Sequence, residues 1–365
     1  MDALSKISVV LPSLDPDEKL VAVIDGLLEH GFTDIILVND GSKPENLHYF
    51  EDAAAQHSEI HLLHHEVNRG KGAALKTAFA WFLENRPEAA GVVTVDGDNQ
   101  HHPEDTRACA QTMLDTGNIV LGVRDFSQPD VPKRSRMGNN ITSWVFKVFV
   151  GMKLSDTQTG LRAIPTRQLR QIAEVEGDRF EYETNMLLKV KQWRMHYEQV
   201  KIRTVYIEEN KSSHFRAVRD SWRIYKLILG HFFKYTASSL VSSVVEWGVF
   251  LLLTKVLGSS LKGLALTAVA SFVARLLSSL MNFWVNQKIV FKSDRPAAKA
   301  LLRYFMLVIP MMILQMLLTE GVYQLFGVTE AQVMLRSGIY VAVMVVLFVV
   351  NFLVQQRWVF VSKER

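Results

Sequence analysis

The sequence predicts an α/β domain with a mostly parallel sheet, followed by an all-α membrane domain of four helices. In the first 226 of the 365 residues, short β-branched runs alternate with stretches of helical periodicity, a pattern typical of βαβ units. Beyond residue 226 lie four apolar stretches, each long enough to cross a bilayer, which takes about 20 residues. We therefore expect two domains, residues 1–226 and residues 227–365.

Charge and cysteine content exclude several classes of protein. The formal net charge is only +4 and no basic tract dominates, so we expect no nucleic-acid partner. The single cysteine, Cys109, excludes an internal disulfide and fits a reducing cytosol. The apolar run 7–11 is too short for a signal peptide and stops at Pro12. The first domain should therefore lie in the cytoplasm.

Polar loops follow the predicted strands of the first domain. A helix over residues 20–28 follows the first strand, and an alanine-rich helix over residues 73–85 follows the third. Because the carboxyl ends of parallel strands meet at one edge of a sheet, these loops should converge there. The predicted strands cover residues 7–11, 34–38, 60–63, 92–95 and 119–121.

The loop after the fourth strand is Asp96-Gly97-Asp98, and Pro103 then begins a helix. Two carboxylates separated by a glycine at the end of a strand can turn toward one point outside the sheet. Hard oxygen ligands of this kind suit Mg²⁺ or Mn²⁺, with phosphates of a substrate completing the coordination. Taken alone, the pattern is also that of an ordinary Asp-Gly turn.

Two other loops add to this site. Asp40 could accept hydrogen bonds from a nucleobase or ribose, or simply belong to an Asn-Asp-Gly turn. In the loop 68–72, Arg69 and Lys71 lie with backbone N–H groups at a helix N-terminus, which suits a diphosphate. No Gly-x-Gly-x-x-Gly follows the first strand, so a nucleotide-diphosphate site is favoured over a dinucleotide site.

Residues 39–42 (NDGS), 68–75 (NRGKGAAL) and 96–104 (DGDNQHHPE) resemble the motifs of glycosyltransferase family 2, of the dolichyl- or polyprenyl-phosphate sugar synthase type. The resemblance covers roughly residues 7–226 and implies a GT-A fold and inversion at the anomeric carbon. The metal ligands expected on this basis are Asp96, Asp98 and Gln100. The expected donor-binding residues are Pro12, Leu14, Asp15, Asp40, Lys71, Asp96 and Gly97.

Two segments depart from the family pattern. Asp15-Pro16 stands where the family usually has Asn-Glu, so Asp17 or Glu18 could supply the ribose contact instead. Residues 208–216 correspond to the family's Arg-x-x-Gly-x-Ser-Lys loop over the diphosphate, with a histidine in place of the lysine. From this loop we expect donor contacts by Lys211 and His214.

A basic cluster that contains Arg134 and Arg136 precedes the amphipathic stretch 141–150. This stretch is either a helix packed on the core or an interfacial helix with its cations at the lipid headgroups. In the second case the phosphate of a membrane-bound acceptor would meet those cations. Arg124 follows the fifth predicted strand, and the family has an arginine at the matching position. The expected ligands of the acceptor phosphate are Arg124, Arg134, Arg136 and Arg216.

Asp156 is an isolated acid in the loop 156–162 (DTQTGLR), where a helix N-cap would be the ordinary reading. In the family, the aspartate of this loop lies beside the sugar and the acceptor. A lipid phosphate is already an anion near neutral pH, so no general base is required. Electrostatic positioning of the attacking oxygen is therefore the expected role. In the family, acids of the segment matching residues 180–183 help to shape the sugar pocket. The expected catalytic residues are Asp156, Asp98 and Arg124.

The predicted spans alternate with cationic clusters. Positive charge gathers in residues 216–234, 288–303 and 357–365, whereas the two hairpin loops carry little charge. By the positive-inside rule, both termini and the middle loop are expected in the cytoplasm, which makes this a multi-pass protein of the cell membrane. The predicted spans cover residues 233–257, 261–285, 301–326 and 333–354.

The membrane half is duplicated. Residues 282–291 (NFWVNQKIVF) recur as residues 351–360 (NFLVQQRWVF), an offset of 351 − 282 = 69. Two hairpins in parallel orientation follow, and this half resembles the GtrA-like membrane family, which is linked to polyprenyl-phosphate sugars and their transbilayer movement. Within the spans, Glu246 and Arg275 either form a structural ion pair or allow Arg275 to meet a lipid phosphate.

These features together predict a membrane-bound inverting glycosyltransferase that uses Mg²⁺ or Mn²⁺. It would move a hexose from a nucleotide-diphosphate sugar, preferably a UDP-sugar, to polyprenyl (undecaprenyl) phosphate for cell-envelope glycosylation. The competing hypothesis is a lipid-linked sugar translocase whose cytoplasmic domain only binds the donor or carrier. A processive polysaccharide synthase is disfavoured, because the first domain lacks a Gln-x-x-Arg-Trp motif. A homo-oligomer is compatible with the sequence.

Overall fold

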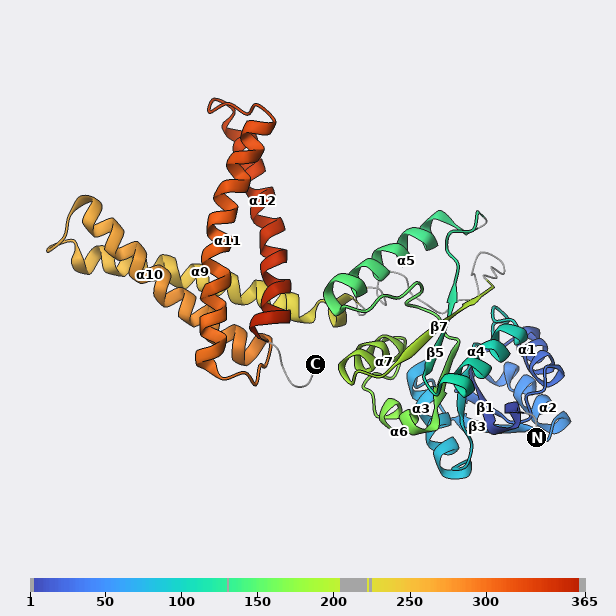
Figure 1. Ribbon diagram of the computed structural model, residues 1–365. Coiled ribbons are helices and arrows are strands. Elements are labelled where there is room, and N and C mark those ends of the chain that lie inside the picture. The colour runs from blue at the N-terminus through green and yellow to red at the C-terminus, as the bar shows by residue number, and fades with distance from the viewer. Residues whose placement is uncertain (1–2, 130, 204–221, 223–224, 361–365) are drawn as a thin grey trace. The chain divides into compact units, whose positions relative to one another are not determined.

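The computed structural model describes residues 3–129, 131–203, 222 and 225–360 (Figure 1). The chain divides into two compact units, Met1–Ile228 and Leu229–Arg365. Within its described residues, the first unit is a mostly parallel α/β domain, and the second consists of four long apolar helices. The predicted fold class is therefore confirmed.

The sheet of the first unit has the strand order β3-β2-β1-β4-β6-β5-β7 within the described residues. Neighbouring strands are parallel except around β6, which runs antiparallel to both β4 and β5. Neither β6 nor β7 was predicted from the sequence. The strands are β1 (Ile7–Ser13), β2 (Ile35–Asp40), β3 (Ile60–His65), β4 (Gly91–Thr94), β5 (Ile119–Arg124), β6 (Arg162–Pro165) and β7 (Tyr197–Ile202).

Helices flank this sheet, and their ends follow local rules. The side chain of Asp17 accepts a hydrogen bond from the backbone N–H of Lys19 and so caps the first helix. Pro103 occupies the first turn of α4, as predicted, and Gly117 ends that helix in the left-handed conformation. The helices are α1 (Glu18–Glu29), α2 (His48–Gln56), α3 (Lys71–Asn85), α4 (Pro103–Thr116), α5 (Lys133–Val145), α6 (Thr166–Ala173) and α7 (Glu181–Gln192).

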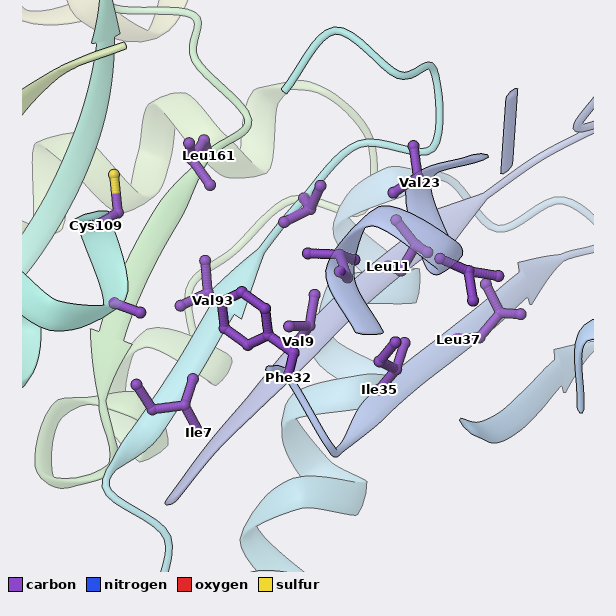
Figure 2. Close-up of a cluster of buried hydrophobic side chains, with 14 of the residues drawn as sticks. Ile7, Val9, Leu11, Val23, Phe32, Ile35, Leu37, Val93, Cys109 and Leu161 are labelled. Carbon is purple, nitrogen blue, oxygen red and sulfur yellow. The ribbon is translucent and has the colours of Figure 1, made fainter. Parts of the chain in front are cut away.

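The core under α1 and α4 is built from alternate residues of the central strands (Figure 2). Val9 and Leu11 of β1, Leu37 of β2 and Val93 of β4 are all fully buried, and Val23 of α1 packs on them. The intervening strand residues are buried as well, as expected where helices cover both faces of a parallel sheet. This packing fixes the strand ends from which the polar loops emerge.

The second unit contains α9 (Gly230–Leu257), α10 (Gly263–Val285), α11 (Ala297–Leu325) and α12 (Val333–Val354). In the described part of the chain these four helices are long and apolar enough to cross a membrane, which agrees with the predicted spans. α10 and α12 each end in a π-helical turn, Asn286–Val290 and Gln355–Val359. The two turns begin 355 − 286 = 69 residues apart, so the repeat seen in the sequence is also a repeat of backbone structure.

Equivalent residues of the two repeats contact each other. Asn286 donates a hydrogen bond of 3.2 Å to its counterpart Gln355, and the ring of Phe291 stacks on that of its counterpart Phe360 at 5.3 Å. A contact between one repeat and the other also recurs with the repeats exchanged. The ring centroids of Tyr235 and Phe352 lie 5.2 Å apart, and those of their counterparts Tyr304 and Phe283 lie 5.6 Å apart. The two hairpins are therefore joined by a contact with approximate two-fold symmetry.

Candidate active site

The loops after β1 and β2 lie against each other at the carboxyl edge of the sheet. Asp15 has a positive φ of 47° and its carboxylate accepts a hydrogen bond from the backbone N–H of Lys43. The hydroxyl of Ser42 in turn accepts from the N–H of Asp15. Pro12 is buried in β1, and Leu14 follows directly after that strand. The structure thus brings Pro12, Leu14 and Asp15 next to the loop that begins at Asp40.

Asp40 shapes the loop before α3. Its buried carboxylate accepts hydrogen bonds from the backbone N–H groups of Arg69 (2.9 Å) and Gly70 (2.8 Å) and contacts His65 Nδ1 at 2.7 Å. Gly70 has a φ of 102°, and a Cβ there would lie 2.4 Å from the carbonyl oxygen of Asp178. The carboxylate therefore fixes this loop, but it occupies the backbone N–H groups of Arg69 and Gly70, which the sequence had led us to expect on a diphosphate. Its contact with the nucleoside stays a prediction.

Lys71, at the first turn of α3, reaches the loop after β4. Its Nζ lies 2.7 Å from Asp96 Oδ1 and 3.2 Å from the carboxylate of Glu183, which belongs to α7. Burial alone would lower the pKa of Lys71, but the charges of Asp96 and Glu183 raise it above its ordinary value. Burial alone would raise the pKa of Asp96, but Lys71 and His101 hold it well below the usual range. Both groups are therefore charged at neutral pH.

Asp98 and Gly160 complete the surroundings of Asp96. Burial and the charge of Asp96 raise the pKa of Asp98. Asp98 accepts a hydrogen bond from the backbone N–H of Gln100, which holds this loop in a tight turn. A Cβ on Gly160 would lie 2.2 Å from Asp96 Oδ2, so the Asp96 side chain fits only because this position has none.

The donor set at this edge fits a hard divalent cation. In the described ranges, no three His, Cys, Asp or Glu side chains are arranged to hold a metal by themselves. Asp96 and Asp98 offer carboxylate oxygens. The Lys71 ammonium, which carries a single positive charge, already lies 2.7 Å from Asp96, so this carboxylate has a cation as its partner. Mg²⁺ and Mn²⁺ suit such sites, where one or two carboxylates and substrate phosphates share the coordination. Asp96, Asp98 and Gln100 are the residues that would hold the cation.

Arg124 and Asp156 form a second cluster. The guanidinium of Arg124 donates to Asp156 from Nε (2.7 Å) and from Nη2 (3.2 Å), and the Asp156 side chain is fully buried. Asp156 also accepts from the backbone N–H of Gln158. Because Gly160 of the same loop lies against Asp96, this loop contacts both clusters.

Other predicted residues lie outside these clusters. Arg136 is on α5, where it donates to the carbonyl oxygen of Gln128. Arg134 is also on α5, but its side chain is not among those that the structure describes. Lys211, His214 and Arg216 fall in 204–221, outside the described residues.

α5 exposes a row of apolar side chains. Met137, Ile141 and Trp144 are 62, 47 and 57% exposed, and their spacing of four and three residues places them on one helix face. Lys133 begins the helix, and Lys147 lies in the π-helical turn that follows it. An exposed apolar face with cations at its ends is the arrangement expected of an interfacial helix.

Sequence reasoning gave Arg162 no role, and it placed Glu183 in a segment expected to shape the sugar pocket without its contact to Lys71. Arg162 is 1% exposed and donates from Nε to the carbonyl of Thr159 and from Nη1 to the backbone carbonyl of Glu183. The carboxylate of Glu183 contacts Lys71, which precedes it by 112 residues. No local pattern signals a contact over that separation. The position of Arg162, two residues after Gly160 in the motif, was the available hint.

Comparisons with known proteins identify families for both parts of the chain. A family profile described as glycosyl transferase family 2 matches residues 8–191, and one described as GtrA/DPMS, transmembrane domain matches residues 234–360. The chain is similar to a UDP-N-acetylglucosamine–dolichyl-phosphate N-acetylglucosaminyltransferase of Methanococcus voltae, with 26% identity over 55% of this chain and 86% of that protein. An undecaprenyl-phosphate mannosyltransferase of Micrococcus luteus is 25% identical over 46% of this chain and 69% of that protein. A solved mannosyltransferase of Pyrobaculum calidifontis, in complex with GDP-Man and Mn²⁺, aligns over 97% of this chain and 87% of that chain with 12% identity and a TM-score of 0.40.

Proposed function

Since this chain belongs to glycosyl transferase family 2 and continues into a GtrA/DPMS transmembrane domain, as its motifs indicated, we propose that it is a polyprenyl-phosphate glycosyltransferase of the cell membrane. It transfers a hexose from a nucleotide-diphosphate sugar to polyprenyl phosphate, with its first unit and both termini in the cytoplasm. A UDP-sugar is the preferred donor, a choice supported by the similarity to the UDP-N-acetylglucosamine–dolichyl-phosphate N-acetylglucosaminyltransferase of Methanococcus voltae.

The observation that carries this proposal is the loop 156–162, which contacts two sets of charged residues. Through Gly160 it adjoins Asp96, the candidate ligand of the cation that binds the donor. Through Asp156 it holds Arg124, the candidate ligand of the acceptor phosphate. A transferase needs its two substrates within bonding distance, and one short loop that reaches both sites provides that proximity.

The reaction is a displacement at the anomeric carbon. An oxygen of the lipid phosphate forms a bond to that carbon on one face while the bond to the diphosphate breaks on the other, which inverts the configuration. When bound, the divalent cation neutralises charge on the departing diphosphate. Lys71, at the N-terminus of α3, binds the same diphosphate with its ammonium group. Asp156 fixes the guanidinium of Arg124, which orients the attacking phosphate.

The test is release of nucleoside diphosphate by the purified full-length protein across a panel of nucleotide sugars. Each reaction contains Mn²⁺ or Mg²⁺ and is run with and without undecaprenyl phosphate. Release that requires the lipid and one sugar nucleotide supports the proposal and identifies the donor. Asp96→Asn should abolish turnover, whereas Asp115→Asn, an exposed aspartate on α4, should not change it.

The main competitor is a translocase whose first unit only binds the donor. It predicts donor binding without release of nucleoside diphosphate across the whole panel. Full metal-dependent activity in Asp96→Asn would likewise contradict the assignment of this site.

A further inference from the structure

Lys71 contacts two carboxylates that come from different elements. Its ammonium lies 2.7 Å from Asp96, just after β4, and 3.2 Å from both oxygens of Glu183 on α7. An ammonium has three N–H donors and can satisfy both partners at once. The three side chains are only 13 to 29% exposed, so solvent screens these contacts weakly.

Glu183 is held in place independently of Lys71. The fully buried Arg162 donates to the backbone carbonyl of Glu183 at 2.9 Å, and its Nη2 lies 3.8 Å from Glu183 Oε1. Arg162 is anchored at its other side by the carbonyl of Thr159. Glu183 therefore offers Lys71 a fixed counter-charge that does not depend on what happens at Asp96.

Two cations, the Lys71 ammonium and the divalent metal ion, are candidates to bind Asp96. On the proposed function, from which this inference starts, Asp96 also binds the divalent cation. The ammonium contacts Oδ1 of Asp96 at 2.7 Å, and a divalent cation bound to the same carboxylate would bring two positive charges close together, which repel each other. This repulsion favours loss of the contact between Lys71 and Asp96 when the metal binds.

We propose that Lys71 competes with the divalent cation for Asp96, and that Glu183 receives Lys71 when the cation binds. The ammonium pairs with Asp96 in the metal-free protein, so that this carboxylate keeps a positive partner when no metal is bound. After metal binding, Lys71 stays within the site because Glu183 retains it. It then lies beside the cation, on the side where the diphosphate of the donor is expected.

The proposal makes two predictions of opposite sign for metal affinity. Lys71→Gln removes the competitor, so Mn²⁺ should bind about tenfold more tightly, since hydrogen bonds to charged groups are worth at least that much. Glu183→Gln removes the alternative partner, so Lys71 stays on Asp96 and Mn²⁺ should bind more weakly by a similar factor. Lys71→Arg keeps the positive charge and should remain close to the wild-type affinity.

The experiment is a titration of the full-length protein in detergent with Mn²⁺ alone, in which free Mn²⁺ is measured by electron paramagnetic resonance. The matched control is Lys76→Gln on the same helix, because Lys76 pairs with the exposed Asp178 at 3.0 Å and not with Asp96. Far-UV circular dichroism of each variant verifies that it is folded.

Three outcomes separate this inference from the proposed function. Loss of binding in Asp96→Asn, tighter binding in Lys71→Gln and weaker binding in Glu183→Gln support it. If Asp96→Asn loses binding but Lys71→Gln matches the wild type or binds more weakly, the competition is wrong and the metal site stands. Wild-type affinity in Asp96→Asn would overturn both the competition and the assignment of the metal to this loop.

Discussion

Arg124 and Asp156 face each other through two hydrogen bonds, Nε to Oδ2 and Nη2 to Oδ1, although they lie 32 residues apart in the sequence. The contact joins the end of β5 to the loop before β6. Asp156 is fully buried, so its charge depends on this partner and on backbone N–H donors. A guanidinium held at two points has a fixed orientation, which suits it to orient a phosphate.

Breaking this pair should lower both stability and activity. Arg124→Gln leaves a buried carboxylate without its cation and should cost about 3–5 kcal/mol in the free energy of unfolding. Asp156→Asn keeps the shape but removes the charge, so it should destabilise less and slow transfer strongly. Denaturation in detergent and release of nucleoside diphosphate measure the two effects. Strictly additive losses in the double variant would show that the two side chains are not coupled.

Gly160→Ala should impair metal binding without unfolding the protein. The added methyl group would lie 2.2 Å from Asp96 Oδ2 and must push that carboxylate aside. We expect a loss of Mn²⁺ affinity of about tenfold or more, since a displaced charged ligand loses at least one strong contact. The control is Gly138→Ala on α5, where a Cβ meets nothing within 4 Å. Equal Mn²⁺ affinity in the two variants would argue against this role of Gly160.

Trp144 should insert into the lipid interface if α5 is an interfacial helix. The emission of Trp144 is the difference between the fluorescence of the wild type and that of Trp144→Phe. In vesicles that contain brominated lipids, bromine should strongly quench this difference. Trp81 stacks on His61 and lies under Arg86, in a polar cluster with Asp34. The emission lost in Trp81→Phe should therefore be unquenched. Quenching of neither component would favour a helix that packs on protein.

Cys109 should be unreactive in the folded protein. Burial, and to a lesser degree the charge of Asp105, raises the pKa of its thiol to about 12 from an ordinary value of 9.0. A thiol-specific reagent should label it only as fast as the protein unfolds. Because the unfolded thiol ionises first, the stability that depends on this group is present below about pH 9 and is lost as the pH rises toward 12. Rapid labelling of native protein at pH 8 would contradict this, and Cys109→Ser gives the blank.

The sequence predicted those strands and helices that have a hydrophobic pattern within their own residues. The β-branched runs that became β1, β2 and β4, and the four spans, each carry their own hydrophobic pattern. β6 has only four residues and pairs antiparallel with β4 and β5. It was not predicted because the residues Arg162–Pro165 contain no pattern that indicates this pairing.

The candidate site shows the same division. The carboxylates of Asp96 and Asp98 were recognisable because they lie together in one short motif. The contact of Lys71 with Glu183 was not, because it depends on where α7 packs against α3. Arginine is rarely fully buried, so the sequence gives no reason to expect Arg162 in the interior. It is buried there because backbone carbonyl groups accept hydrogen bonds from its guanidinium.

The symmetric contact between the membrane repeats has a consequence for how this unit assembles. Residues that face their own counterparts, as Asn286 faces Gln355 and Phe291 faces Phe360, form the kind of isologous surface on which two identical chains dimerise. A single hairpin of the ancestral sequence could therefore have built the same unit from two separate chains. The short segment 291–296 turns that encounter into an intramolecular one, with an effective concentration on the order of millimolar. Once the halves were tethered, each could diverge alone, and the ion pair of Glu246 with Arg275 is present in only one of them.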